Sequence, residues 1–187
     1  MDRLIELVNL AIKISAEEEQ IIRSYFEKVE IKNKTELLRQ GQKSNQLYFI
    51  EKGLIHTYYY HDDKEVTSWF YAEENFVTSW YSFLSQAPSF EYLRALEDTT
   101  AHTITYSKLQ QLYKECPAFE RFGRILAEQN LAFLESYSKG YMFLSAKEKY
   151  DLLNATIPDI TLRVKLGQIA SFLGISQETL SRLRSKK

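Results

Sequence analysis

The spacing of apolar residues changes along the chain, and each change predicts a different kind of element. Residues 2–12 and 16–28 show the spacing of amphipathic helices, and Ser15 stands where a helix N-cap is expected. From 29 to 105, short runs rich in Val, Ile, Thr, Tyr and Phe alternate with polar turn segments. Strands at this spacing predict a β-sandwich or a barrel-like roll, with a short helix inserted at 78–86.

Helical spacing returns after the strand region. The segment SKLQQLYKE, capped by Ser107, predicts a short helix, and Pro117 suits the first turn of a long helix that runs to about Lys139. The apolar residues of this long helix cover more than one narrow stripe, so the helix should be buried on two sides. One side can pack on the strand region. The other is covered either by a two-fold partner chain or by another part of the same chain. A further helix is expected at 145–156.

The C-terminal segment contains two short amphipathic helices separated by a glycine. The first has apolar residues at positions i, i+3, i+4 and i+7, namely Leu166, Ile169, Ala170 and Leu173. Gly174 suits a turn with positive φ, Ser176 can cap the second helix, and Leu180 and Leu183 face inward from it. This pattern is typical of a helix-turn-helix, although any antiparallel helix pair can show it.

Composition and charge indicate what kind of partner this segment has. The 187 residues, 44% hydrophobic and 26% charged, are ordinary for a globular protein and permit one large domain with or without a small one. Residues 160–187 carry six basic residues and one acidic residue, whereas residues 1–159 carry 18 basic and 24 acidic residues. A basic end on an acidic body favours a polyanionic partner, although a solvated terminal helix can carry lysines without one.

The cysteine content and the hydropathy favour a cytoplasmic protein. Cys116 is the only cysteine, which excludes an internal disulfide, a cysteine zinc site and an iron–sulfur cluster. No stretch approaches the ~18 apolar residues of a membrane span. The N-terminus has the pattern of an amphipathic helix and lacks a signal peptide's cleavage site. We therefore expect no metal, cofactor or membrane partner.

The outward face of the second C-terminal helix carries residue types that read the edges of DNA bases. Arg182 can donate two hydrogen bonds to a guanine, Glu178 can accept one from a cytosine and Gln177 can pair with an adenine. Ser181 lies on the same face, and Glu178 can alternatively serve only the helix dipole. The residues better placed to hold phosphates are Arg163, Lys165, Gln168, Thr179 and Lys186.

With these residues in place, the segment GISQETLSRLR (174–184) resembles the recognition segment of the Crp/Fnr family of bacterial transcription factors. The resemblance covers nearly the whole chain, and within the family the chain is most similar to members from Bacteroidetes-type bacteria. It implies an α+β fold with three parts. These are a cyclic-nucleotide-binding-like β-roll (a double-stranded β-helix) with flanking helices at 1–116, a dimerisation helix at 117–140, and a helix-turn-helix domain with little or no wing at 141–187.

The resemblance also implies partners. Members of the family act as homodimers that read a two-fold operator in double-stranded DNA, with the base-reading glutamate and arginine matched here by Glu178 and Arg182. Gln177 replaces a further family arginine, so the base preference at that position should differ. RNA polymerase is a further candidate partner. The dimer contacts are expected from Phe119, Phe122, Leu126 and Phe133.

The effector site departs from the family pattern. Members that bind cyclic nucleotides have a glycine and a glutamate before a short helix and an arginine–serine pair after it. Here Thr78 and Ser79 stand at the first pair of positions, and Ser89 and Phe90 at the second. A buried cyclic phosphate needs a positive partner, and the nearest, Arg94, lies on the following strand. We therefore expect no binding of cyclic AMP unless Arg94 turns into the site, and the effector ligand stays open.

Other functions have less support. The sequence has no P-loop, no GxSxG and no HExxH motif, so we do not expect an enzyme. The three histidines stand outside any motif, which disfavours haem. The alternatives are a sensor of a small molecule other than a cyclic nucleotide and a protein-binding adaptor. Four aromatic residues of the strand region can line a pocket or fill a core: Trp69, Trp80, Tyr81 and Phe83.

Overall fold

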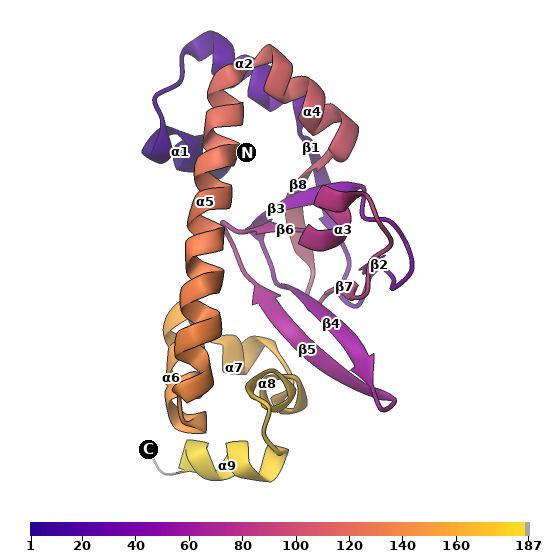
Figure 1. The fold of residues 1–187 in the computed structure, drawn as a ribbon, viewed down its shortest axis with the longest axis vertical. Coiled ribbons are helices and arrows are strands. Elements are labelled where there is room, and N and C mark those ends of the chain that lie inside the picture. The colour runs from indigo at the N-terminus through magenta and orange to yellow at the C-terminus, as the bar shows by residue number, and fades with distance from the viewer. Residues whose placement is uncertain (186–187) are drawn as a thin grey trace.

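The computed structural model describes residues 1–185 and has the mixed α+β fold that the sequence predicts (Figure 1). Helices α1 (Asp2–Ala11) and α2 (Ala16–Tyr25) lie at one end of a β-roll. The hydroxyl of Ser15 accepts the Glu18 N–H at 3.2 Å, which confirms the expected N-cap. Helix α2 ends three residues earlier than expected, because the chain turns extended at Phe26 and enters the first strand.

Eight antiparallel strands form the roll as two four-stranded sheets, with orders β1-β8-β3-β6 and β2-β7-β4-β5. The single helix within this region, α3 (Trp80–Ser85), follows β6, inside the segment where a short helix is expected. The strands are β1 (Glu27–Ile31), β2 (Glu36–Leu38), β3 (Gln46–Lys52), β4 (Ile55–His61), β5 (Lys64–Tyr71), β6 (Phe76–Val77), β7 (Tyr92–Ala95) and β8 (Thr99–Thr105).

The inner faces of the two sheets meet in an apolar core that includes Ile50, Ile55, Leu93 and Ala95. Gly53, in the turn between β3 and β4, has φ of +120°, and a Cβ built on it would lie 2.3 Å from the Thr99 hydroxyl oxygen. Only glycine therefore allows the β3–β4 turn to approach the start of β8 so closely.

The long helix of the fold begins at Pro117, as the sequence predicts. Helix α4 (Tyr106–Glu115) is capped by the hydroxyl of Thr105, which accepts the Lys108 N–H at 3.2 Å, and not by Ser107 as expected. The cap moves because β8 runs directly into the helix. Helix α5 (Pro117–Gly140) follows and runs along most of the length of the molecule (Figure 1). Its first half packs with α1, α2 and α4 in a second apolar core.

The C-terminal residues form a small helical module at the other end of the roll (Figure 1). Its core is shared with Leu54 and Phe70 of the roll, so the module is packed against the β4–β5 hairpin. No helix among residues 1–185 is long and apolar enough to cross a membrane. The elements of the module are η1 (Tyr141–Phe143), α6 (Ala146–Thr156), α7 (Ile160–Arg163), α8 (Leu166–Leu173) and α9 (Gln177–Ser185).

Candidate nucleic-acid interface and effector site

Helices α8 and α9 form the helical hairpin that the apolar spacing predicts. Gly174 ends α8 in the left-handed region with φ of +68°, and the Ile175 N–H donates to the Ala170 carbonyl at 3.0 Å. The Ser176 hydroxyl accepts the Thr179 N–H at 3.2 Å and so caps α9, as expected. The hairpin is closed by a buried apolar set, Ile169, Ala170, Leu173 and Leu180.

The outer face of α9 is free. Gln177, Glu178, Ser181 and Arg182 are all exposed, and they occupy one side of the helix opposite the buried Leu180. The Ser176 hydroxyl and the Glu178 backbone N–H lower the pKa of the Glu178 carboxyl, so this group is an anion at neutral pH. An anion and a guanidinium thus stand one helical turn apart on an uncovered surface.

The residues expected to hold phosphates have different surroundings in the structure. Lys165 is exposed at the start of α8, where its N–H donates to the Gln168 side chain at 3.3 Å, and Thr179 is half-buried on α9. Thr179 thus shares α9 with the exposed face, and Lys165 and Gln168 lie at the start of α8, the other helix of the hairpin. Lys186 lies outside the described residues.

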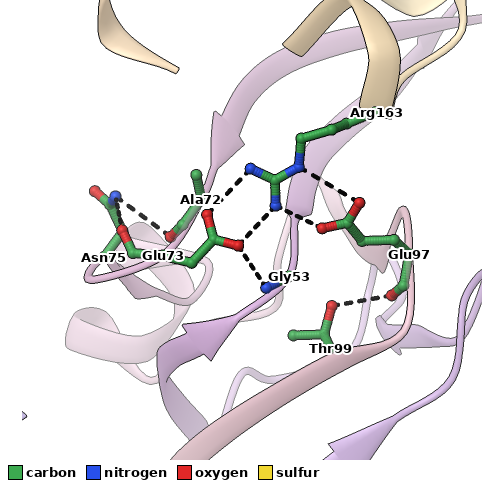
Figure 2. Close-up of polar contacts among 7 residues, drawn as sticks. All are labelled: Gly53, Ala72, Glu73, Asn75, Glu97, Thr99 and Arg163. Atoms are coloured by element: carbon green, nitrogen blue, oxygen red, sulfur yellow. Dashed lines mark hydrogen bonds and ion pairs between the residues drawn. The ribbon is translucent and has the colours of Figure 1, made fainter. Parts of the chain in front are cut away.

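Arg163 does not join them. Its guanidinium is held by the carboxylates of Glu73 and Glu97, and its side chain is only 19% exposed (Figure 2). Arg163 therefore binds two carboxylates of the roll in this structure and is not presented as a phosphate ligand. The sequence did not reveal this, because both partners lie more than sixty residues away.

Three of the four effector-site positions that flank α3, here called the cassette, form hydrogen bonds within the protein. Thr78 and Ser79 are fully buried. The Thr78 hydroxyl lies 2.9 Å from that of Ser44 and donates to the Gln46 carbonyl at 2.8 Å. The Ser79 and Ser89 hydroxyls lie 2.9 Å apart. Phe90 points outward, 57% exposed. The hydroxyls of Thr78, Ser79 and Ser89 are thus paired with partners inside the protein.

Arg94 points away from this cassette. Its neighbours Leu93 and Ala95 face the core between the sheets, so alternation along β7 directs Arg94 to the outer face. There the guanidinium bonds to Glu65 at 2.8 Å and Glu36 at 3.2 Å. Two carboxylates neutralise it, and it would have to pass through the sheet to meet a ligand inside the roll.

A carboxyl group that the sequence analysis did not identify lies at the cassette. Glu91 accepts from the Ser68 hydroxyl at 3.5 Å, and its backbone N–H donates to the Ser89 hydroxyl at 3.1 Å. Burial raises the pKa of Glu91. Its inward position could have been found by extending the alternation of Leu93 back along the chain. Neither this carboxyl nor the neighbouring hydroxyls supply the positive partner that a buried cyclic phosphate needs, so the residues present do not fit a cyclic nucleotide.

A half-open cavity of about 450 Å³ lies next to the cassette. It adjoins the cassette through Ser44, the residue that bonds to Thr78. Its lining combines apolar side chains such as Leu38 and Leu93 with polar ones such as Gln46, as small-molecule sites do. The main lining residues are Leu38, Lys43, Gln46, Tyr48 and Leu93. Among residues 1–185, no group of three or more His, Cys, Asp or Glu is arranged to hold a metal ion.

The long helix has a different free surface from the one expected. Phe119 and Phe122 are 2% and 3% exposed because they fill the core formed with α1, α2 and α4, so they are not available to a partner chain. Leu126 is half-buried against the same core, and Phe133 packs edge-on against Trp69 at 5.6 Å. The exposed large apolar residues of α5 are Leu131, Phe133 and Leu134, at 68%, 49% and 58%, so Phe133 is the one exposed residue among the four expected dimer contacts.

Comparisons with known proteins agree with this fold. Residues 28–116 match the family described as "Cyclic nucleotide-binding domain". No curated protein sequence matches the chain.

Among solved structures, the c-di-GMP responsive global regulator CLP of Xanthomonas campestris aligns over 92% of this chain and 91% of its own, with 20% identity and a TM-score of 0.66. FixK2 of Bradyrhizobium japonicum aligns over 86% and 83%, with 17% identity and a TM-score of 0.69. A putative transcriptional regulator of the Crp/Fnr family from Eubacterium rectale aligns over 92% and 83%, with 15% identity and a TM-score of 0.64. Residues 28–116 therefore resemble the cyclic nucleotide-binding domain family, and the chain has the fold of these solved regulators.

Proposed function

We propose that this protein is a DNA-binding transcriptional regulator of the Crp/Fnr type. The observation that carries the proposal is the exposed face of α9, where Gln177, Glu178, Ser181 and Arg182 stand on a hairpin whose core is closed by Ile169, Ala170, Leu173 and Leu180. A helix that presents such side chains to solvent can enter the major groove and meet base edges. Lys165, Gln168 and Thr179 flank this face and hold the neighbouring phosphates.

The regulator acts as a homodimer in this proposal, with residues 1–116 as effector domain, 117–140 as dimerisation helix and 141–187 as DNA-binding domain. Leu131 and Leu134 support the dimer, because they are large apolar side chains left uncovered on the second half of α5. A two-fold partner would bury them and would place the two copies of α9 about 34 Å apart, the spacing of successive major grooves.

The effector of this regulator is not cyclic AMP in our proposal. The paired hydroxyls of Ser79 and Ser89 and the neighbouring carboxyl of Glu91 leave neither the cation nor the room that a cyclic phosphate needs. A small molecule held in the cavity beside Ser44 and Tyr48 is the favoured alternative.

The decisive experiment selects bound sequences from a random DNA pool with the full chain. We expect a two-fold site, and a selection without enrichment would contradict the proposal. Arg182→Ala should weaken binding by about 1–3 kcal/mol and relax the preference at one base pair. Arg121→Ala, which removes an exposed arginine from α5, is the matched control and should leave the selected sequence unchanged.

The salt dependence of binding distinguishes this proposal from an adaptor that binds another protein through the same hairpin. Binding to several phosphates weakens steeply as salt rises from 50 to 200 mM, whereas binding through apolar surface does not. A uniform loss of affinity for all sequences in Arg182→Ala would make Arg182 a phosphate contact.

A further inference from the structure

Arg163 forms a double ion pair between the C-terminal module and the roll. Its Nη1 and Nη2 atoms donate to the two carboxylate oxygens of Glu73 at 3.1 and 2.8 Å, a side-by-side arrangement. Its Nε and Nη2 atoms donate to Glu97, the former at 3.4 Å (Figure 2). One guanidinium thus joins two carboxylates that come from different turns of the roll.

The two carboxylates are anchored on their own side of the contact. Glu73 also accepts the backbone N–H of Gly53 at 2.8 Å, and the Thr99 hydroxyl donates to the carbonyl of Glu97 at 3.0 Å (Figure 2). The side chains of Glu73 and Glu97 are 38% and 32% exposed, so the pairs are partly shielded from water. Arg163 therefore binds two carboxylates whose positions are determined by the roll.

The positions of the two carboxylates connect this contact with the inside of the roll. Glu73 follows the end of β5 by two residues, and Glu97 follows the end of β7 by two residues. Strand β5 carries Ser68, and Glu91 directly precedes β7, and these two residues bond to each other at the cassette. A displacement of either strand at the cassette would therefore move one of the carboxylates that hold Arg163.

A second contact joins the module to the exposed edge of the roll. Strand β5 is the last strand of its sheet, so its outer backbone groups have no strand partner. The Ser171 hydroxyl of α8 accepts the Thr67 N–H at 3.1 Å and donates to the Glu65 carbonyl at 3.2 Å. Apolar packing around Phe70 supplies adhesion between the two parts, whereas these directional bonds allow one orientation only.

We propose that Arg163 is the positioning residue of an interdomain latch, which holds the DNA-binding module in one orientation on the roll and ties that orientation to the ends of β5 and β7. The latch is a property of the folded chain, and only its consequence for DNA rests on the function proposed above. Arg163 touches no ligand in this role. It acts by orienting α8 and, through α8, the exposed face of α9.

The latch can be tested without DNA through the amide of Thr67, whose hydrogen bond exists only while the module is docked. Arg163→Gln should increase the hydrogen exchange of this amide about tenfold, while the amides of β3 and β8 keep their wild-type rates. Arg124→Gln is the matched control, because it removes an arginine–glutamate pair that lies wholly within α5. An unchanged Thr67 rate in Arg163→Gln, or an equal increase in Arg124→Gln, would overturn the latch.

Two further variants keep the test decisive. If Arg163→Gln does not fold, Arg163→Lys replaces it, because lysine keeps the charge but cannot form the fork to two carboxylates. Glu97→Gln should also increase the Thr67 rate, and the double variant with Arg163→Gln should add little more, because both remove the same contact. Fully additive effects would show that the two residues act separately and would contradict the proposal.

The effect on DNA is measured with the site that the wild-type protein selects. Arg163→Gln should lower the affinity about tenfold without changing the selected bases, because a released module spends only a fraction of its time in the binding orientation. Tighter binding by the variant would show that the latch holds the module away from DNA and would overturn the positioning role. A wild-type protein that binds no DNA would contradict the proposed function, while the exchange of the Thr67 amide still decides the latch.

Discussion

Replacing His56 with phenylalanine should make folding less sensitive to acid. The imidazole is fully buried, and neither of its nitrogens has a hydrogen-bond partner within residues 1–185. It stacks on Tyr58 with 4.8 Å between the ring centroids and lies 6.3 Å from the ring of Phe70. A phenyl ring can take the same place between two aromatic neighbours, and it removes a polar group that the fold leaves unsatisfied.

The magnitude follows from the burial of the ring. Burial lowers the pKa of His56 from 6.5 to about 3, and the charge of Arg94 acts in the same direction. Between these two values the unfolded chain binds a proton that the folded chain does not, so the native state loses stability as the pH falls below 6.5. One pKa unit corresponds to about 1.4 kcal/mol, so the loss at pH 4.5 should be about 2.7 kcal/mol.

The assay is urea unfolding of the wild-type protein and of His56→Phe between pH 7.5 and pH 4.5. Subtracting one free energy of unfolding from the other cancels the pH-dependent contribution of the carboxylates that both proteins share. The difference should grow in favour of the variant by about 1.4 kcal/mol for each pH unit below 6.5. His61→Phe, which removes an exposed imidazole from the same strand, controls for the substitution itself. A difference that stays flat across the series would show that the native state accepts the proton on His56 and would refute the reasoning.

Three further predictions test the dimer, the effector site and the roll. Leu134→Glu should convert the protein to a monomer in sedimentation experiments, whereas Leu10→Glu, at an even more exposed leucine on α1, should not. Calorimetry with cyclic AMP should give no binding heat, and micromolar affinity would contradict the description of the cassette. Gly53→Ala should lower the free energy of unfolding by several kcal/mol and so lower the melting temperature sharply. The new Cβ would collide with Thr99, and the backbone there has a positive φ that alanine disfavours. A melting curve close to that of the wild type would contradict this account of the turn.

The regular parts of this fold could be predicted because their signals are local. The hairpin at the C-terminus depends on the spacing of four apolar residues and on one glycine, all within a few turns of chain. The proline at the start of α5 and the serine caps of α2 and α9 act on neighbouring backbone groups. Alternation between turn segments and β-branched or aromatic runs predicted a roll of strands without any knowledge of their order.

The contacts that combine distant segments could not be predicted in this way. The sequence shows that α5 is apolar on two sides, but it does not show that the side with Phe119 and Phe122 meets the chain's own helices. Arg163 lies in a basic segment, and its two acidic partners stand in turns that look solvent-exposed when read alone. The same holds for Glu91, whose inward direction becomes visible only when the faces of β7 are known.

Helix α8 contacts the roll and α9 with different faces, and this bears on how a signal would travel between them. Ser171 bonds to the edge of β5, and Phe172 packs against Phe70 at 5.3 Å, whereas Ile169 and Leu173 are buried in the core that includes Leu180 of α9. A helix of eight residues has no room to bend between these faces. A movement of β5 therefore carries α9 with it directly. In the family that this chain resembles, the long helices are expected to transmit the signal. Here the edge of β5 offers a second and shorter route, because β5 itself carries Ser68, which bonds to Glu91 inside the roll.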